Sequence, residues 1–402
     1  MKKDNRRNFL KNSFIAASGI PLIASALKPS LKTTFAETEK KLVYRTLGKT
    51  GLKVPIVSMG TGDTDNAKLV DAALSQGIVL LATSQYYGNG KNEQMLGEVF
   101  KGRKRDSFLI ATSVMPDGID FKNGLYTDAS KEEPFMKKFE GSLQRLGLDH
   151  VDILWLPFAG KRESVFYEPL LKAMENIKKQ GKARFIGIAT HSYETEAIRA
   201  ATDTKIYDVI MTAYNFRKKN IAEMNEAITY AASAGLGIVA MKTMAGAFWD
   251  KERTKPINTK AALKWVLQNE NIHTTVPGFT TFDQLDQNMK IMADLQLTDQ
   301  EKTDLVADIQ LSNGVYCQQC GECIPQCTQS LDIPTIMRSY MYAYGYKNLT
   351  HARQTLTYTG TTLNPCDNCT SCGVNCKMGF DVKQKITDIA RLKNVPSDFL
   401  LG

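Results

Sequence analysis

The sequence predicts an α/β fold, with a (β/α)8 TIM barrel over residues 42–297 and a helical linker with a small, mainly helical domain over residues 298–402. Two observations lead to this prediction. Short apolar runs alternate with amphipathic helical stretches eight times, and all eight cysteines lie beyond residue 316. Residues 1–36 form a separate basic segment ahead of the barrel.

The predicted strands are nearly continuous apolar runs rather than alternating ones, as expected for parallel strands that are buried on both faces. Eight strand and helix units of this length predict a closed barrel. The strands are Val54–Gly60, Ile78–Ser84, Phe108–Val114, Val151–Leu156, Phe185–Thr190, Val209–Tyr214, Gly237–Thr243 and Thr274–Gly278.

Glycines close several of the predicted helices just before the next strand, at Gly77, Gly147, Gly181 and Gly235. Glycine is favoured there because a helix commonly ends on a residue in the left-handed conformation. The helices include Lys68–Gln76, Pro134–Leu146, Tyr167–Gln180, Ile221–Ala234 and Lys260–Asn269.

The segment after the barrel opens with Thr298 and Glu301, which have the spacing of a capping box at the start of a further helix. The cysteines follow in two copies of one spacing, C-x2-C-x2-C-x3-C. In two-cluster ferredoxins, three closely spaced thiolates wrap one cubane cluster, and the fourth reaches the other cluster. The sequence therefore predicts a ferredoxin-type domain with two [4Fe-4S] clusters, one held by Cys317, Cys320, Cys323 and Cys376, the other by Cys366, Cys369, Cys372 and Cys327.

Two other uses of the cysteines were weighed. Four disulfides are possible by count, but a chain of 402 residues with 43% hydrophobic residues can build a core without them. Zinc sites need four ligands from paired spacings, which fit this pattern poorly. Thr328 and Lys377 stand where ferredoxins usually have a proline after the fourth cysteine, which is a departure from the consensus.

The N-terminal segment carries Arg6 and Arg7 ahead of a moderately apolar run over residues 14–27, and it resembles a twin-arginine export signal. The run is too short to span a bilayer comfortably, so we expect no membrane anchor in the mature chain. Export of a folded protein suits a chain that receives clusters in the cytoplasm, and we expect a periplasmic location. A signal for unfolded export, or a start site chosen too far upstream, remains an alternative.

The formal net charge of +9 is concentrated in the N-terminal segment, where seven basic residues and Asp4 leave +6 over residues 1–36 and +3 for the remainder. A mature chain so close to neutral gives no electrostatic reason to expect nucleic acid or an anionic membrane as a partner.

Motifs along the whole barrel resemble the aldo-keto reductases, and the cysteine domain with Leu331-Asp332-Ile333-Pro334 resembles the C-terminal extension of the ferredoxin-fused branch of that family. The resemblance covers roughly residues 42–390 and implies the barrel fold. The barrel motifs are Tyr87-Gly88-Asn89 with Asn92-Glu93-x3-Gly97, Asp152-Ile-Leu, Ile186-Gly187-Ile188, Tyr214-Asn215, Gly237-Ile-Val-Ala-Met, and Val276-Pro277-Gly278 followed by Asn288.

The resemblance also implies a catalytic set that this chain has largely lost. The family uses a tyrosine as general acid, a lysine that lowers its pKa, an aspartate that pairs with the lysine, and a histidine that orients the carbonyl. Only the tyrosine is retained, as Tyr87. The aspartate, lysine and histidine positions hold Ala82, Ser113 and Pro157.

The positions that hold the nicotinamide nucleotide in the family are changed as well. The pair that binds the nicotinamide amide falls on Ala189 and Thr190, the glutamine of the sixth strand on Met211, and the arginine for the 2′-phosphate on Gln284. Alanine and methionine cannot supply the missing hydrogen bonds. We therefore do not expect NADP to be a cofactor.

The catalytic candidates that remain at the carboxyl ends of the strands are Tyr87, Lys242 and His191. Lys242 lies in an otherwise apolar strand, where an ammonium needs an acidic partner or an anionic ligand. His191 has the alternative of a structural role beside a backbone group. The same face is expected to present aromatic residues, for which packing is the simpler role: Tyr86, Trp155 and Tyr214.

Three functions are compatible with these observations. The first is an exported iron-sulfur oxidoreductase or electron-transfer protein, whose clusters exchange electrons with a redox partner or with a small-molecule substrate on the barrel. The second is an NAD(P)H-dependent aldo-keto reductase with an altered acid-base set. The third is a non-catalytic binding module with structural clusters. The substrate, the direction of electron flow and the partner do not follow from the residues.

Overall fold

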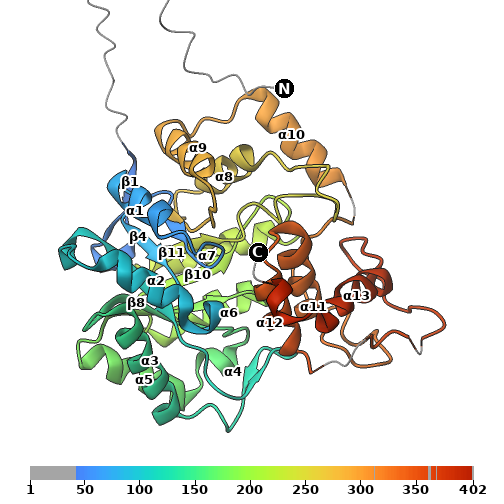
Figure 1. Cartoon of the computed structure of the whole chain (residues 1–402), viewed down its shortest axis with the longest axis horizontal. Coiled ribbons are helices and arrows are strands. Elements are labelled where there is room, and N and C mark those ends of the chain that lie inside the picture. The colour runs from blue at the N-terminus through green and yellow to red at the C-terminus, as the bar shows by residue number, and fades with distance from the viewer. Residues whose placement is uncertain (1–41, 312, 361–363, 368, 401–402) are drawn as a thin grey trace, which may run out of the picture. The chain divides into compact units, whose positions relative to one another are not determined.

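The computed structural model describes residues 42–311, 313–360, 364–367 and 369–400. Its centre is a sheet of eight parallel strands in the order β3-β4-β5-β8-β9-β10-β11-β12 (Figure 1). Isolated parallel bridges, Val57 to Thr275 and Gly60 to Gly278, link its two edges and nearly close the barrel, so the predicted fold class is confirmed. The strands are β3 (Met59–Gly60), β4 (Leu80–Ala82), β5 (Leu109–Ser113), β8 (Val151–Pro157), β9 (Ala183–Thr190), β10 (Val209–Ala213), β11 (Gly237–Met241) and β12 (Thr274–Thr275).

The first predicted strand, Val54–Gly60, is wrong in part because the structure divides it. Its beginning forms β2 (Lys53–Pro55), which pairs antiparallel with β1 (Tyr44–Thr46) in a separate hairpin. Only β3 joins the barrel. Pro55 ends the hairpin strand because a proline has no N–H to continue a ladder in the interior of a sheet.

The helices around the barrel agree with the predicted segments to within about two residues, the usual uncertainty of helix ends. The four predicted glycines have φ between +66° and +95°, which confirms the left-handed ends. The helices are α1 (Ala67–Ser75), α2 (Lys91–Phe100), α3 (Glu132–Leu146), α4 (Arg162–Val165), α5 (Glu168–Lys179), α6 (Glu194–Thr204), α7 (Ile221–Ser233), α8 (Thr259–Leu267) and α9 (Phe282–Ala293).

The capping box at Thr298 and Glu301 is present and opens α10 (Asp299–Gln310). The region beyond it is mainly helical, as predicted, with α11 (Ile333–Tyr340), a π-helical turn η4 (Met341–Gly345), α12 (Leu349–Thr357) and α13 (Val382–Ala390). The short elements are η1 (Gly48–Thr50), η2 (Tyr87–Gly90), η3 (Arg105–Ser107), β6 (Ile119–Asp120), β7 (Leu125–Tyr126), η5 (Arg391–Asn394) and η6 (Ser397–Leu400).

The C-terminal helices cover loops at the carboxyl ends of the barrel strands. Their apolar core is continuous with side chains that follow β10 and β11, among them Phe216, Ala245 and Trp249. Lys122 of the β6–β7 hairpin donates a 2.8 Å hydrogen bond to the carbonyl of Ser330. In Figure 1, α11 and α12 lie beside the barrel. The face on which barrels of this type place their sites is thus closed by the second region.

The predicted export signal, residues 1–36, lies outside the described residues. Within the described part of the chain, every helix is too short or too polar to cross a membrane.

Candidate functional site

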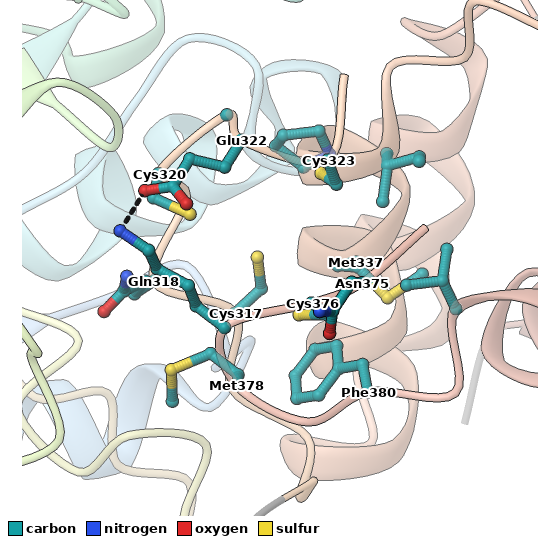
Figure 2. Close-up of a pocket in the computed structure, with 15 residues that line it drawn as sticks. Cys317, Gln318, Cys320, Glu322, Cys323, Met337, Asn375, Cys376, Met378 and Phe380 are labelled. Atoms are coloured by element: carbon teal, nitrogen blue, oxygen red, sulfur yellow. Dashed lines mark ion pairs between the residues drawn. The ribbon is translucent and has the colours of Figure 1, made fainter. Parts of the chain in front are cut away.

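The cysteines meet in two groups. Cys317, Cys320, Cys323 and Cys376 line one pocket, which Figure 2 shows with their side chains directed toward it. Cys376 comes from the second motif, so the structure brings together the same four residues that the spacing predicts for one cluster. The pocket has about 390 Å³ of empty space.

The second pocket is lined by Cys327, Cys366, Cys369 and Cys372, which are the four residues predicted for the other cluster. Each pocket is thus lined by three cysteines of one motif and one cysteine of the other. None of the eight cysteines forms a disulfide.

The helices of the C-terminal region separate the two pockets. Ile333 at the start of α11 and Val382 at the start of α13 line both of them, so a thin apolar layer lies between the two cysteine groups. The first motif can turn tightly because Gln319 and Gly321 have φ of +61° and +76°. The Gln319 N–H points at the Cys317 sulfur over 3.4 Å.

The chemistry of these thiols fits an iron-sulfur cluster. Burial raises the pKa of Cys317, that of Cys323 to about 12 and that of Cys366 to about 11, and the neighbouring cysteines act in the same direction. Thiols in such surroundings stay protonated without a positive centre nearby, and bound iron would supply that centre and let them act as thiolates. Among the described residues, no three His, Cys, Asp or Glu side chains converge on one point as ligands of a single ion do. Cysteines spread around a cavity suit a multi-iron cluster better than zinc.

A buried ion pair attaches the first cysteine loop to the barrel. Lys218, after β10, pairs with Glu194 at the start of α6, and their side chains are 1% and 4% exposed. The Lys218 ammonium also donates to the Gln318 carbonyl at 3.2 Å, and the Lys219 N–H donates to the Gln318 side-chain oxygen at 3.1 Å. The residue after Cys317 is therefore held by the barrel.

Lys242 follows β11 with φ of +57° and is partly buried. Its ammonium lies 4.6 Å from the ring centroid of Tyr342 and 5.7 Å from that of Tyr346. Burial lowers the pKa of Lys242, but Tyr342, Tyr346 and Asp63 outweigh it and hold the pKa above its usual value. Lys242 is therefore charged at neutral pH.

His191 follows β9 and is only 9% exposed. Its ring stacks on Phe158, with centroids 5.1 Å apart. Burial, followed by the positive charges of Arg338 and Lys242, holds the pKa of His191 well below its usual value, so the imidazole is neutral. Its Nδ1 atom has no hydrogen-bond partner among the described residues. The predicted structural role beside a backbone group therefore does not account for Nδ1.

Tyr87 is placed apart from Lys242. Its ring makes edge contacts with Tyr86 and His351, at centroid distances of 5.0 and 5.4 Å. Burial and then Tyr86 raise the pKa of Tyr87 well above its usual value, and no lysine is among the groups that act most on it. Ser113 contacts the neighbouring hydroxyl of Tyr86.

Lys242 and His191 line one cavity together with Cys317, whereas Tyr87 is not part of its lining. The other aromatic candidates differ from expectation. Trp155 is fully buried in the barrel interior. Tyr214 is turned toward the helices, where it stacks on Trp265 at 5.4 Å and donates to Asn225.

Three residues of this face come from the C-terminal region and were not predicted. Tyr342 of the π-helical turn stacks on His351 at 3.9 Å, and Arg338 of α11 lies 5.1 Å from the ring centroid of Phe158. Burial, Lys242 and Arg338 lower the pKa of His351 to about 3. Arg338 is the one of the three with a sequence signal, because it is a basic residue among the apolar residues of α11.

The four residues at the positions where the resemblance predicts contacts to a nicotinamide nucleotide make hydrogen bonds or packing contacts within the chain. Thr190 donates a 2.7 Å hydrogen bond to the carbonyl of Ser192. Gln284 accepts a 2.7 Å bond from the Thr280 N–H. Ala189 and Met211 belong to the apolar cluster inside the barrel.

Replacing Lys218 with Met is expected to destabilise the fold and to loosen the first cysteine loop. The Glu194 carboxylate would be left buried without its partner, which costs about 3–5 kcal/mol. Urea unfolding and iron content measure both effects. The matched control is Lys101→Met, whose pair with Glu98 is exposed and should matter by less than about 1 kcal/mol. Equal effects of the two substitutions would contradict the role of the buried pair.

Comparisons with known proteins agree with this architecture. The sequence model of the aldo/keto reductase family matches residues 56–261, and that of a 4Fe-4S dicluster domain matches residues 316–381. L-galactose dehydrogenase of Arabidopsis thaliana is 27% identical over 303 residues, which cover 64% of this chain and 90% of that protein. The uncharacterized oxidoreductase YrpG of Bacillus subtilis is 28% identical over 225 residues, 50% of this chain and 67% of that protein.

Among solved structures, the holo form of aldo-keto reductase AKR11C1 from Bacillus halodurans superposes with a TM-score of 0.54 at 21% identity. The superposition covers 66% of this chain and 96% of that one, and it shows the shared barrel fold. The chain therefore belongs to the aldo/keto reductase family and carries a C-terminal 4Fe-4S dicluster domain.

Proposed function

We propose that this protein is an exported iron-sulfur oxidoreductase in which two [4Fe-4S] clusters exchange electrons with a small molecule on the carboxyl-end face of the barrel. One observation carries the proposal. Cys317 lines both the first cysteine pocket and the cavity that contains Lys242 and His191. A ligand in that cavity would lie against a residue that holds the first cluster.

The cysteines divide into two sets of four, each with three from one motif and one from the other. One-electron transfer is the chemistry that such a cluster supplies when bound. The chain's own contribution is to hold the thiolates, to direct the Gln319 N–H at the Cys317 sulfur, and to separate the two sets by a thin apolar layer. Hydrogen bonds to sulfur and low exposure are the means by which a protein adjusts a cluster's potential.

The barrel residues have three distinct roles in this proposal. Lys242 keeps its charge and attracts a negative group on the ligand. His191 stays neutral and offers Nδ1 as a hydrogen-bonding atom. Tyr87 is too weak an acid to donate a proton as the family's tyrosine does, and it acts as a neutral hydroxyl beside Tyr86.

An NAD(P)H-dependent reductase with an altered acid-base set is the second candidate. The match to L-galactose dehydrogenase, which is 27% identical and covers 90% of that protein, favours this candidate. The changed positions at Ala189, Met211 and Gln284 argue against it, since none offers the expected contact to a nicotinamide nucleotide. A binding module with structural clusters is distinguished by clusters that have no accessible reversible couple.

The cluster assignment predicts about eight iron and eight sulfide ions per chain in protein matured without oxygen. Cys376→Ala should abolish the same electron paramagnetic resonance signal as Cys320→Ala, and Cys327→Ala the same signal as Cys369→Ala. Ser371→Ala, which lines the second pocket but supplies no thiolate, serves as the control. The assignment of the fourth cysteine of each motif to the other motif's cluster would be refuted if Cys327→Ala abolished the same signal as Cys320→Ala, and Cys376→Ala the same signal as Cys369→Ala.

Binding of nicotinamide nucleotides is expected to be weak or absent. The lost charge-assisted contact at Gln284 alone is worth about 1.5–3 kcal/mol. Calorimetric titration with NADPH and NADH, a turnover assay on aldehydes and spectroelectrochemistry of the clusters separate the candidates. Reversible cluster couples without nucleotide binding support electron transfer. Micromolar NADPH affinity with turnover that disappears in Tyr87→Phe would establish the reductase instead.

Export is expected to require Arg6 and Arg7. The double change to lysine should leave the precursor in the cytoplasm with its clusters present, because targeting and cluster insertion are separate steps. Cell fractionation with iron analysis tests this, and Lys2→Arg with Lys3→Arg is the control outside the pair. Normal export of the double-lysine variant would exclude the twin-arginine route.

A further inference from the structure

A small, partly open pocket lies between the barrel and the first cysteine loop. The barrel contributes residues at or just after the carboxyl ends of β9, β10 and β11, and the C-terminal region contributes α11, η4 and the loop around Cys317. The cavity therefore exists only where the two regions meet. Its lining includes His191, Ala213, Lys242, Cys317, Arg338 and Met341.

Two positive charges border this cavity without a carboxylate partner. Arg338 is 6% exposed, and within the described residues its guanidinium donates one hydrogen bond, over 3.3 Å to Thr335 of its own helix. Lys242 lies over the rings of Tyr342 and Tyr346 and hydrogen-bonds to Tyr342. Within the described residues, neither takes part in an ion pair. A buried cation without a counter-ion is costly, so the site favours an anion.

The carboxylates nearest to these cations do not neutralise them directly. Asp63 acts on Lys242 from a distance and accepts a hydrogen bond from Asn348 at 2.9 Å. Asp332 acts on Arg338, but its carboxylate caps α11 by accepting from the Thr335 N–H. Both acids are already used in the structure, and neither of them lines the cavity.

The first cysteine loop already has a cation close by, because the Lys218 ammonium donates to the Gln318 carbonyl beside Cys317 and is paired with Glu194. Lys242 and Arg338 have no such ion pair among the described residues, and both line the cavity.

An unpartnered polar atom on the cavity wall is the second, independent observation. His191 is 9% exposed, so more than nine-tenths of its surface is buried, and its Nδ1 has no hydrogen-bond partner among the described residues. Unsatisfied buried polar atoms are rare in folded proteins and call for a partner such as water or a ligand. Ala213 and Met341 add apolar surface to the wall, which Tyr316 and Gln319 complete, and the apolar part suits a small organic body.

We propose that this cavity binds a small organic carboxylate, held by Arg338 and Lys242 and hydrogen-bonded to Nδ1 of His191, next to Cys317. The planar guanidinium of arginine matches the two oxygens of a carboxylate, and lysine adds a point charge. This inference rests on the proposed function, because it specifies the class of small molecule that meets the first cluster.

The test is calorimetric titration of the oxidised, cluster-containing protein with malonate and acetate, with acetamide as the neutral analogue of acetate and inorganic phosphate as a competing anion. The wild type should bind a carboxylate with a dissociation constant below about 1 mM and acetamide not measurably. Lys242→Met and Arg338→Met should each weaken binding at least about tenfold, as expected for the loss of a charged contact. Lys101→Met removes an exposed lysine outside the cavity and should leave binding unchanged.

A second measurement does not depend on binding heat. Malonate should change the electron paramagnetic resonance signal of the reduced cluster that Cys320→Ala abolishes, and it should leave the signal of the other cluster unaltered. The reason is that Cys317, which is predicted to hold the first cluster, is the one cysteine that lines the cavity. Iron content and thermal unfolding verify that each variant is folded. Should Arg338→Met fail to fold, Lys242→Met decides, since the Lys242 side chain is partly buried and takes part in no ion pair among the described residues.

Binding that both substitutions leave unchanged, absence of carboxylate binding, or tighter binding of phosphate than of any carboxylate would each overturn the inference. These outcomes are separate from failure of the proposed function. Clusters without a reversible couple would refute electron transfer, even if the oxidised protein still bound a carboxylate. Redox-active clusters in a protein that binds no carboxylate would refute the carboxylate site and leave the proposed function standing.

Discussion

The buried ion pair between Lys218 and Glu194 is the interaction on which the arrangement of this protein depends. It holds the carbonyl of Gln318 and thereby fixes the first cysteine loop on the carboxyl-end face of the barrel. Charges this deeply buried are stable only when paired and hydrogen-bonded. The barrel and the cysteine region therefore stabilise one another, and Cys317 is placed at the boundary between them.

The same arrangement changes what the barrel face can do. C-terminal helices bring Tyr342, His351 and Arg338 to the positions above the strands. The two histidines on this face are neutral because burial and nearby cations lower their pKa values. A site that combines neutral histidines with permanent cations suits the binding of an anion better than general acid catalysis by tyrosine.

Both cysteine groups draw ligands from both motifs, which ties the two loops together through α11 and α13. Occupied clusters would then act as cross-links between segments far apart in the sequence, and metal binding in such domains is coupled to folding. Removal of iron is expected to affect the C-terminal helices first, and with them the cover of the barrel face.

The amino-acid sequence by itself determined the barrel, its glycine helix ends, the capping box at Thr298 and the grouping of the cysteines, because each follows from periodicity or spacing within a short stretch. The division of the first strand at Pro55 and the outward direction of Tyr214 depended on hydrogen-bond and packing partners that local pattern does not specify. Only the tertiary structure decided that Arg338 meets Lys242 and His191. Arg338 is separated from Lys242 and His191 by about a hundred positions or more, and its approach to them results from docking of one region on the other, a long-range contact with no local sequence signal.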